Sequence, residues 1–244
     1  MTHVTPRTFV SIAIFALCAT PSSMALAVGG GLAFNVDESQ IPGALANIVS
    51  TDSMDFTYHS CVHFYAQKKF RESGYFWVSS YQDADSAVDS QINYFAPNGY
   101  RIYGIYTYKA QQWGMSQPTP SGTRVNYVAL LSQPSIELFV DPNQDTTLNL
   151  QNCRAEAVDD DISLGSCNAL AAGEKSETDG LASGDFEVAY GPNWVFTAAG
   201  QALFGNPANF NYLMFNGNVT DLGGALGVDH TPEGSGNIYW LDVF

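Results

Sequence analysis

The segment MDFTYHSCVHFY (residues 54–65) decides the expected fold. Phe56, Tyr58, Val62 and Phe64 occupy alternate positions in it, and most of the residues between them are polar. Because successive side chains of a β-strand point to opposite faces, this alternation predicts a strand with one buried face and one polar face.

The same period of two recurs along the chain. Residues 135–140 and 184–190 alternate in this way, and the tyrosine-rich residues 100–109 favour β-structure on both faces. Turn-forming residues separate these runs, since the chain holds 22 Gly and 11 Pro. Helical periodicity is scarce, although residues 83–92 and 167–177 could each form about two or three helical turns. The pattern predicts an all-β (mainly β) fold: an antiparallel two-sheet β-sandwich of the jelly-roll type with one or two short flanking helices.

The beginning of the chain has the pattern of a secretory signal peptide. Arg7 precedes an apolar run over residues 9–17, and small residues at Ala25 and Ala27 suit a cleavage site. We therefore expect residues 1–27 to be removed on export, so that the mature protein is secreted or held at a bacterial cell surface. The apolar run is too short for a transmembrane helix, and no membrane span is expected after cleavage.

Composition and charge limit the class of protein. The chain has 244 residues, of which 45% are hydrophobic and 14% charged, which excludes disordered, collagen-like and coiled-coil classes. No repeat or linker divides it, so residues 28–244 are expected to form a single β-sandwich domain. The net charge is −15, from 24 acidic and 9 basic residues, and loss of Arg7 makes it more negative still. Such a charge disfavours nucleic acid and anionic membranes as partners and leaves cations and neutral glycans.

Export permits disulfide bonds. Cys61, Cys153 and Cys167 remain after the expected cleavage, and the last two bracket a polar segment. A bridge between Cys153 and Cys167 is predicted, and closing so short a loop contributes about 3 kcal/mol in the chain-entropy estimate. Cys61 is then left as a buried thiol, an intermolecular partner or a metal ligand.

Acidic residues after the strand expected at 135–140 suggest a calcium site. Their spacing resembles the first half of a calcium-binding loop, but the glycine and glutamate of an EF-hand are missing. We expect either a looser site for Ca²⁺ or only a turn in which Asp and Asn bond their own backbone. The candidate ligands are Asp141, Asn143, Asp145, Asp159, Asp160 and Asp161.

Residues 54–65 also place His59, Cys61 and His63 on one face of a strand. Imidazole and thiolate are ligands for zinc or copper, and His230 is available as a fourth ligand. The alternative is that these residues form the ordinary polar face of a half-exposed strand.

Four tyrosines are candidates for contacts with sugars. Because a strand alternates, Tyr100, Tyr103, Tyr106 and Tyr108 cannot all face one core, and an exposed tyrosine face can stack on a sugar ring. The alternative is that a second packed layer covers them. Motifs of nucleophilic hydrolases, zinc proteases and nucleotide-binding folds are absent, so we expect no catalytic residues and no enzymatic activity.

Three stretches together carry a resemblance to a known family. They are residues 34–44, which begin FNVDE, residues 91–106, which contain NYFAPNGY, and residues 138–146, LFVDPNQDT. The chain resembles the flocculation-associated PEP-CTERM proteins of bacteria that produce exopolysaccharide. The resemblance implies an exported surface or matrix protein that helps cells to aggregate in flocs or biofilms with secreted polysaccharide, without enzymatic activity. The Pro-Glu-Pro sorting tail of that family is not found at residues 239–244, so processing by exosortase is not implied.

The predicted function is therefore that of a secreted, non-catalytic, glycan-associated protein of the cell surface or extracellular matrix. Its expected partners are extracellular polysaccharide or other surface components, with self-association as a further option. The alternatives are a secreted enzyme acting on polysaccharide and an outer-membrane β-barrel. The second alternative is disfavoured because Asp242 interrupts the apolar face that a lipid-facing strand requires.

Overall fold

The structure is a computed structural model that describes residues 31–94, 98–119, 122–149, 151–156, 160–178, 184–205 and 210–242. The expected signal peptide (residues 1–27) and Asp159 lie outside the described residues. No helix in these ranges combines the length and the hydrophobicity needed to cross a membrane.

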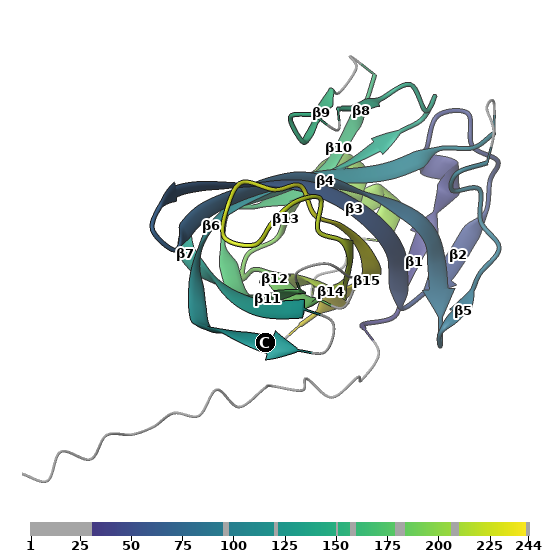
Figure 1. Ribbon diagram of the computed structural model, residues 1–244. Helices are drawn as coiled ribbons and strands as arrows, with labels where there is room; N and C mark the ends of the chain where they lie inside the picture. The colour runs from purple at the N-terminus through teal and green to yellow at the C-terminus, as the bar shows by residue number, and fades with distance from the viewer. Residues whose placement is uncertain are drawn as a thin grey trace, which may run out of the picture.

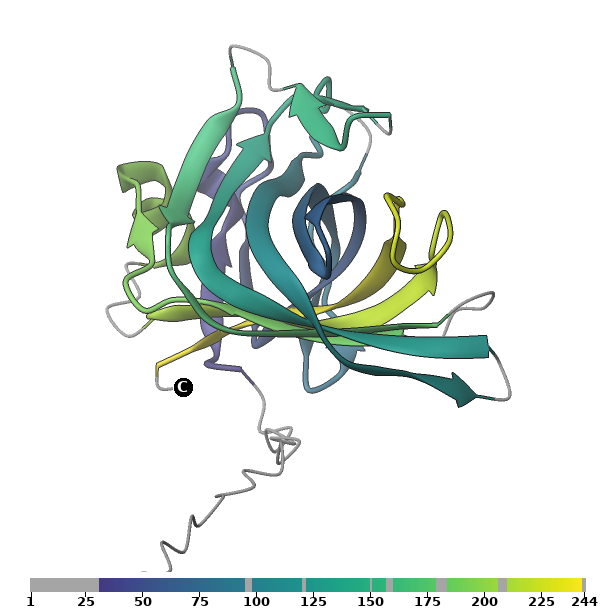
Figure 2. The ribbon, with the colours of Figure 1, turned by 60° about the vertical axis from the view of Figure 1, so that its left-hand side comes forward.

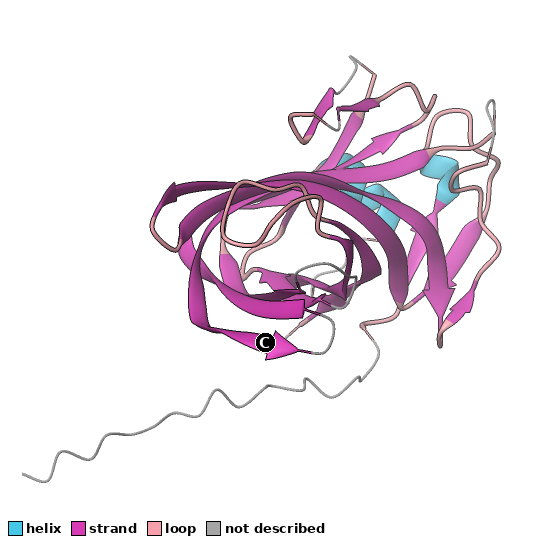
Figure 3. Cartoon of the chain, viewed as in Figure 1, coloured by secondary structure: helices cyan, strands magenta, loops and turns pink. Residues whose placement is uncertain are grey.

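Strands dominate the described chain, and the predicted all-β antiparallel fold is confirmed (Figure 3). The first strands are β1 (Phe34–Asp37), β2 (Ile48–Thr51), β3 (Ser53–Ala66), β4 (Lys69–Asp83), β5 (Ser86–Ala87), β6 (Arg101–Thr119) and β7 (Gly122–Asp141). They are followed by β8 (Thr147–Asn149), β9 (Arg154–Glu156), β10 (Ile162–Cys167), β11 (Leu170–Thr178), β12 (Gly184–Tyr190), β13 (Val195–Phe196), β14 (Tyr212–Asp221) and β15 (Glu233–Leu241). The helices are the 3₁₀-helix η1 (Glu38–Gln40) and α1 (Ala198–Phe204).

Neither segment expected to be helical is a helix. Residues 83–92 hold the short strand β5, and most of residues 167–177 belong to β11. In β11, pairing with both β12 and β7 outweighs the helical propensity of the alanines. The helix α1 lies elsewhere, between the Thr197 side chain, which accepts from the Gly200 N–H, and Gly205 in the left-handed conformation.

One curved antiparallel sheet forms most of the molecule. Its strands run in the order β11, β12, β14, β15, β3, β4, β6, β7, and β7 then pairs with β11 through residues 124–128. The far part of β7 pairs instead with β10, which continues to β13. Two separate sheets were expected, but the strands are joined edge to edge into one sheet. Two halves of this sheet face each other across a common core, as the layers of a sandwich do (Figure 1).

Aromatic rings fill the space between the two halves of the sheet. Phe56 of β3 contacts Phe76 of β4 and Phe215 of β14 edge to face, with ring centroids 5.9 and 5.4 Å apart. The alternation predicted for residues 54–65 holds for Phe56, Tyr58 and Val62, which are all buried. It is less complete at two positions, since Phe64 is only half-buried and His59 on the opposite face is buried as well. Gly104 of β6 is required here because a Cβ atom would lie 2.3 Å from the Phe76 ring.

The two ends of this interior are covered by different segments. Helix α1 lies at one end, where Phe204 and Trp240 pack edge to face at 6.1 Å. The loop of residues 222–232, between β14 and β15, lies at the other end, as Figure 2 shows with α1 at the left and the loop at the right. The polar side chains described below lie beside this loop.

Candidate functional site

The first of two candidate sites is a cleft of about 280 Å³ on the outer face of the sheet. Its lining residues come from β4, β6, β7 and β8, from the loop before β6 and from the turn between β7 and β8: Trp77, Asn93, Arg101, Tyr103, Asp141, Thr146 and Leu148. Trp77 faces outward because its neighbour Phe76 occupies the core. It is paired in register with Tyr103, so the two aromatic side chains lie next to each other on the outer face.

Stacked rings support the aromatic part of the cleft. Trp77 stacks on Tyr75 with centroids 5.9 Å apart, and Tyr103 stacks on Phe139 at 5.3 Å. The Tyr103 hydroxyl donates to Asp161 Oδ2 at 2.8 Å. Burial and this hydrogen bond both raise the pKa of Tyr103, so the phenol stays neutral. Tyr103 is almost fully buried whereas Trp77 is partly exposed, so Trp77 offers the accessible ring.

Two charged side chains in the cleft play different roles. The Asp141 carboxylate accepts the backbone N–H groups of Gln144, Asp145 and Thr146, at 2.5, 3.3 and 3.1 Å. It therefore caps the turn after β7. The Arg101 guanidinium makes no hydrogen bond or ion pair with any residue of the described ranges, so its donors are available to a ligand.

The disulfide that fixes the β8–β9 hairpin differs from the predicted one. Cys61 of β3 is bonded to Cys153, with Cα atoms 5.7 Å apart, and Cys167 is a buried free thiol. The predicted bridge between Cys153 and Cys167 is wrong because Cys167 packs into the hydrophobic core, where β10 pairs with β7. The bridge to Cys61 holds the hairpin that contributes Leu148 to the cleft.

The acidic segments proposed for calcium do lie side by side. The Asn143 amide donates to Asp160 Oδ2 at 2.6 Å and to Asp145 Oδ2 at 3.1 Å. Burial and then the charge of Asp160 raise the pKa of Asp145. Within the described ranges, no three His, Cys, Asp or Glu side chains are arranged to hold a metal ion. The Asn143 amide thus occupies the space between carboxylates in which a shared cation was expected.

The four tyrosines do not form an exposed platform. Tyr100, Tyr103 and Tyr108 are buried and Tyr106 is half-buried. The hydroxyl of Tyr100 donates to Glu38 Oε1 at 2.8 Å beneath η1, so the N-terminal segment is the covering layer there. Tyr103 is the member of the set that lines the outer cleft.

The residues proposed for a transition metal are each engaged elsewhere. The Cys61 sulfur is in the disulfide and cannot bind a metal as a thiolate. His59 Nδ1 is 2.7 Å from Glu233 Oε1, and His63 Nδ1 is 2.7 Å from Asp229 Oδ2. His230 lies against Glu177 in the interior, so the predicted metal site does not form.

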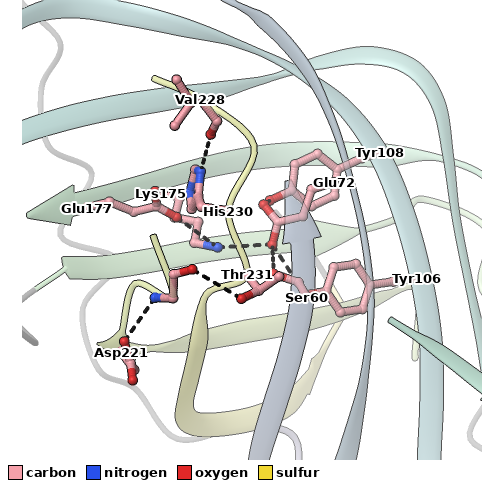
Figure 4. A network of polar contacts seen from close by, with 11 residues as sticks. Ser60, Glu72, Tyr106, Tyr108, Lys175, Glu177, Asp221, Val228, His230 and Thr231 are labelled. Atoms are coloured by element: carbon pink, nitrogen blue, oxygen red, sulfur yellow. Dashed lines mark hydrogen bonds and ion pairs between the residues drawn. The ribbon is translucent and has the colours of Figure 1, made fainter. Parts of the chain in front are cut away.

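Sequence reasoning missed a buried network of charged side chains beside the 222–232 loop (Figure 4). Lys175 Nζ of β11 lies 3.0 Å from Glu72 Oε1 and 3.2 Å from Glu177 Oε1, and all three side chains are at most 5% exposed. Glu72 also accepts hydrogen bonds from hydroxyls of neighbouring strands: those of Ser60, Tyr106 and Tyr108. The available signal was Glu72 itself, an acid at an apolar-face position between Phe70 and Phe76.

A cavity of about 40 Å³ lies next to this network, between Lys175, Tyr190 and several phenylalanine rings. The Tyr190 hydroxyl is buried and has no hydrogen-bond partner within the described part of the chain. A water molecule needs about 10–15 Å³ by this measure, so the cavity suits a few waters and is too small for a sugar. The outer cleft is therefore the better candidate for ligand binding.

Comparison of the chain with protein-family models, with curated proteins and with solved structures gave no match. The resemblance to flocculation-associated proteins therefore stays a prediction.

Proposed function

We propose that this protein is an exported, non-catalytic binding protein for extracellular polysaccharide, and that the outer cleft holds one sugar unit of the chain. The observation that carries this proposal is that a partly exposed Trp77 ring and the Arg101 guanidinium line the same cleft, and that the guanidinium has no partner within the described ranges. A tryptophan face packs on the apolar face of a sugar ring, and a guanidinium donates to its hydroxyl oxygens.

The charge around the cleft supports a neutral sugar. Asp141, Asp145 and Asp161 lie close together at its β7 side, and the whole chain carries a charge of −15. An acidic polysaccharide would be repelled by this field, whereas a neutral one would not. The volume of about 280 Å³ lies just below the usual range of about 300–1,000 Å³ for small-molecule sites, which suits a single ring.

The test is the affinity of a Trp77→Ala variant for neutral oligosaccharides. We expect dissociation constants about tenfold higher than for the wild type, since loss of one stacked ring corresponds to about 1.4 kcal/mol. Isothermal titration calorimetry against glucan and mannan fragments, with a uronic acid polymer as the second arm, measures this. No reducing ends should be released during the titration.

Tyr65→Ala is the matched control, because Tyr65 is an aromatic residue that is 48% exposed and lies outside the cleft. It should bind as the wild type does. If Trp77→Ala keeps wild-type affinity with an unchanged circular dichroism spectrum, the cleft is not the binding site. Tight binding of the uronic acid polymer in place of the neutral fragments would reject the neutral specificity.

The role in cell aggregation rests on the family resemblance. We infer that the protein acts in flocs or biofilms, where its partners are secreted polysaccharide, other surface components or further copies of itself. A deletion strain is expected to aggregate less than its parent. Complementation with the wild type, but not with Trp77→Ala, would connect the phenotype to the cleft.

Calcium binding also stays a prediction. Because Asp141, Asp145, Asp160 and Asp161 repel one another, millimolar Ca²⁺ is expected to raise the melting temperature, and a ligand at 100 times its dissociation constant adds about 2.7 kcal/mol. Asp145→Asn should remove this shift. Melting curves recorded at fixed ionic strength test it, and curves that coincide with and without Ca²⁺ would show that the segment is only a turn.

A further inference from the structure

Residues 222–232, which we call the strap, join β14 to β15 and lie over one end of the interior. Backbone bonds attach the strap to β3, since Val62 N–H donates to His230 O at 2.8 Å and His230 N–H donates to Val62 O at 3.2 Å. Leu226 packs against the small apolar cluster that contains Val62, Phe70 and Tyr108. Leu222 and Pro232 of the strap are buried, and the Ser60 N–H donates to Pro232 O at 3.0 Å. Apolar side chains, backbone hydrogen bonds and polar side chains thus hold the strap together.

His230 is the strap residue that enters the charged network (Figure 4). Its Nε2 atom lies 2.8 Å from Glu177 Oε2, and its Nδ1 atom lies 2.6 Å from the Val228 carbonyl oxygen. Both neighbours are acceptors, and a neutral imidazole has only one N–H group. Burial raises the pKa of Glu177, but the charge of Lys175 and the hydrogen bond from His230 outweigh burial and lower it, so Glu177 is ionised and can only accept. With Glu177 ionised, both contacts are hydrogen bonds only if the ring carries two protons, as an imidazolium does.

The charges of the network agree with this protonation state. Two carboxylates, Glu72 and Glu177, face one ammonium, Lys175, so a neutral His230 would leave a buried net negative charge. Burial lowers the pKa of His230, but the hydrogen bond to Glu177 and the charge of that carboxylate outweigh burial, and the pKa is raised above its ordinary value. The imidazolium completes the charge balance.

Other charged groups around His230 come from three elements. Glu177 and Lys175 of β11 face it directly, and Lys175 opposes its charge. Asp229 of the strap itself accepts from the Phe64 N–H of β3 at 2.8 Å and lies 2.7 Å from His63 Nδ1 on the same strand. The His63–Asp229 pair is exposed, and a neutral His63 can keep that bond by donating from Nδ1. Among these contacts, the one that depends on a second proton is that of His230.

We propose that the strap is a pH-sensitive closure of the interior, locked by the His230 imidazolium between Glu177 and the Val228 carbonyl and released when that imidazolium loses a proton. Since the bound proton is held more tightly in the docked state, docking is complete below the ordinary histidine pKa of about 6.5 and weakens as pH rises through the higher folded value. Release would open the end of the interior at which Lys175 and the phenylalanine-lined cavity lie.

Hydrogen exchange of the full mature chain tests the proposal. The protection factor, which is corrected for the intrinsic effect of pH, is measured for the His230 and Val62 amides at pH 6 and pH 9. Amides of the β12–β14 pairing serve as the internal reference. We expect protection of the strap amides to fall at least about tenfold at the higher pH, which corresponds to about 1.4 kcal/mol, while the reference amides keep theirs.

His230→Gln is the decisive variant and His63→Gln its matched control. His230→Gln should show the low protection at both pH values, whereas His63→Gln should respond to pH as the wild type does. If His230→Gln does not fold, nitrogen-15 spectra of the wild-type histidines replace it, and they should show both ring N–H groups of His230 at pH 6. A neutral tautomer at pH 6, strap protection that does not change with pH, or a pH response that His63→Gln abolishes would each overturn the proposal.

Discussion

Replacement of Lys175 by methionine is expected to lower the free energy of unfolding by about 3–5 kcal/mol, the range for removal of one partner from a buried ion pair. The Lys175 ammonium is shared by Glu72 and Glu177, whose side chains are 2% and 0% exposed. Methionine keeps most of the volume of the side chain but leaves the two carboxylates close together without their cation. Urea denaturation of the wild type and the variant at pH 7 measures the loss.

Lys69→Met is the matched control, because Lys69 is an exposed lysine on β4 and its loss should cost less than about 1 kcal/mol. A variant that also carries Glu72→Gln should recover part of the lost stability, since the remaining buried carboxylate, Glu177, still lies 2.8 Å from the His230 imidazolium. A single Lys175→Met variant as stable as Lys69→Met would contradict the structure of the network.

Removal of the disulfide is the second change with a large expected effect. The two cysteines are 92 residues apart, and the chain-entropy model assigns a loop of about 100 residues a contribution of about 4.7 kcal/mol. We expect the double variant Cys61→Ser and Cys153→Ser to lose about 4 kcal/mol of stability. It should also bind sugar more weakly, because the β8–β9 hairpin that borders the cleft loses its attachment to β3.

Peptide mapping without reduction identifies the bridge directly. A peptide that joins Cys61 to Cys153 is expected, together with an alkylated Cys167 after unfolding. A peptide that joins Cys153 to Cys167 would show that the arrangement of β3 and the hairpin is different. If the double variant and the wild type unfold at the same urea concentration, the bridge does not constrain the chain.

Part of the candidate cleft could be predicted from the sequence. Tyr103 and Asp141 were candidates, although for a tyrosine platform and a calcium site. Trp77, Arg101 and Asn93 were missed because each belongs to a different segment, and nothing local indicates that the three lie together. The signal for Trp77 was the run of three aromatic residues Tyr75, Phe76 and Trp77, in which neighbouring rings must point to opposite faces of a strand.

The sequence by itself determined the class of fold and the buried face of β3. Alternation over residues 54–65 is a local property, since the pleat of a strand sends neighbouring side chains to opposite sides whatever that strand pairs with. Tertiary structure alone decided which side chains meet: Cys61 with Cys153 across 92 residues, Lys175 with Glu72 across 103, and His230 with Glu177. These contacts depend on the order in which the strands pair, and periodicity carries no information about that order. Burial then set the chemistry, because away from water the charges of Glu72, Lys175 and Glu177 must be balanced by their neighbours.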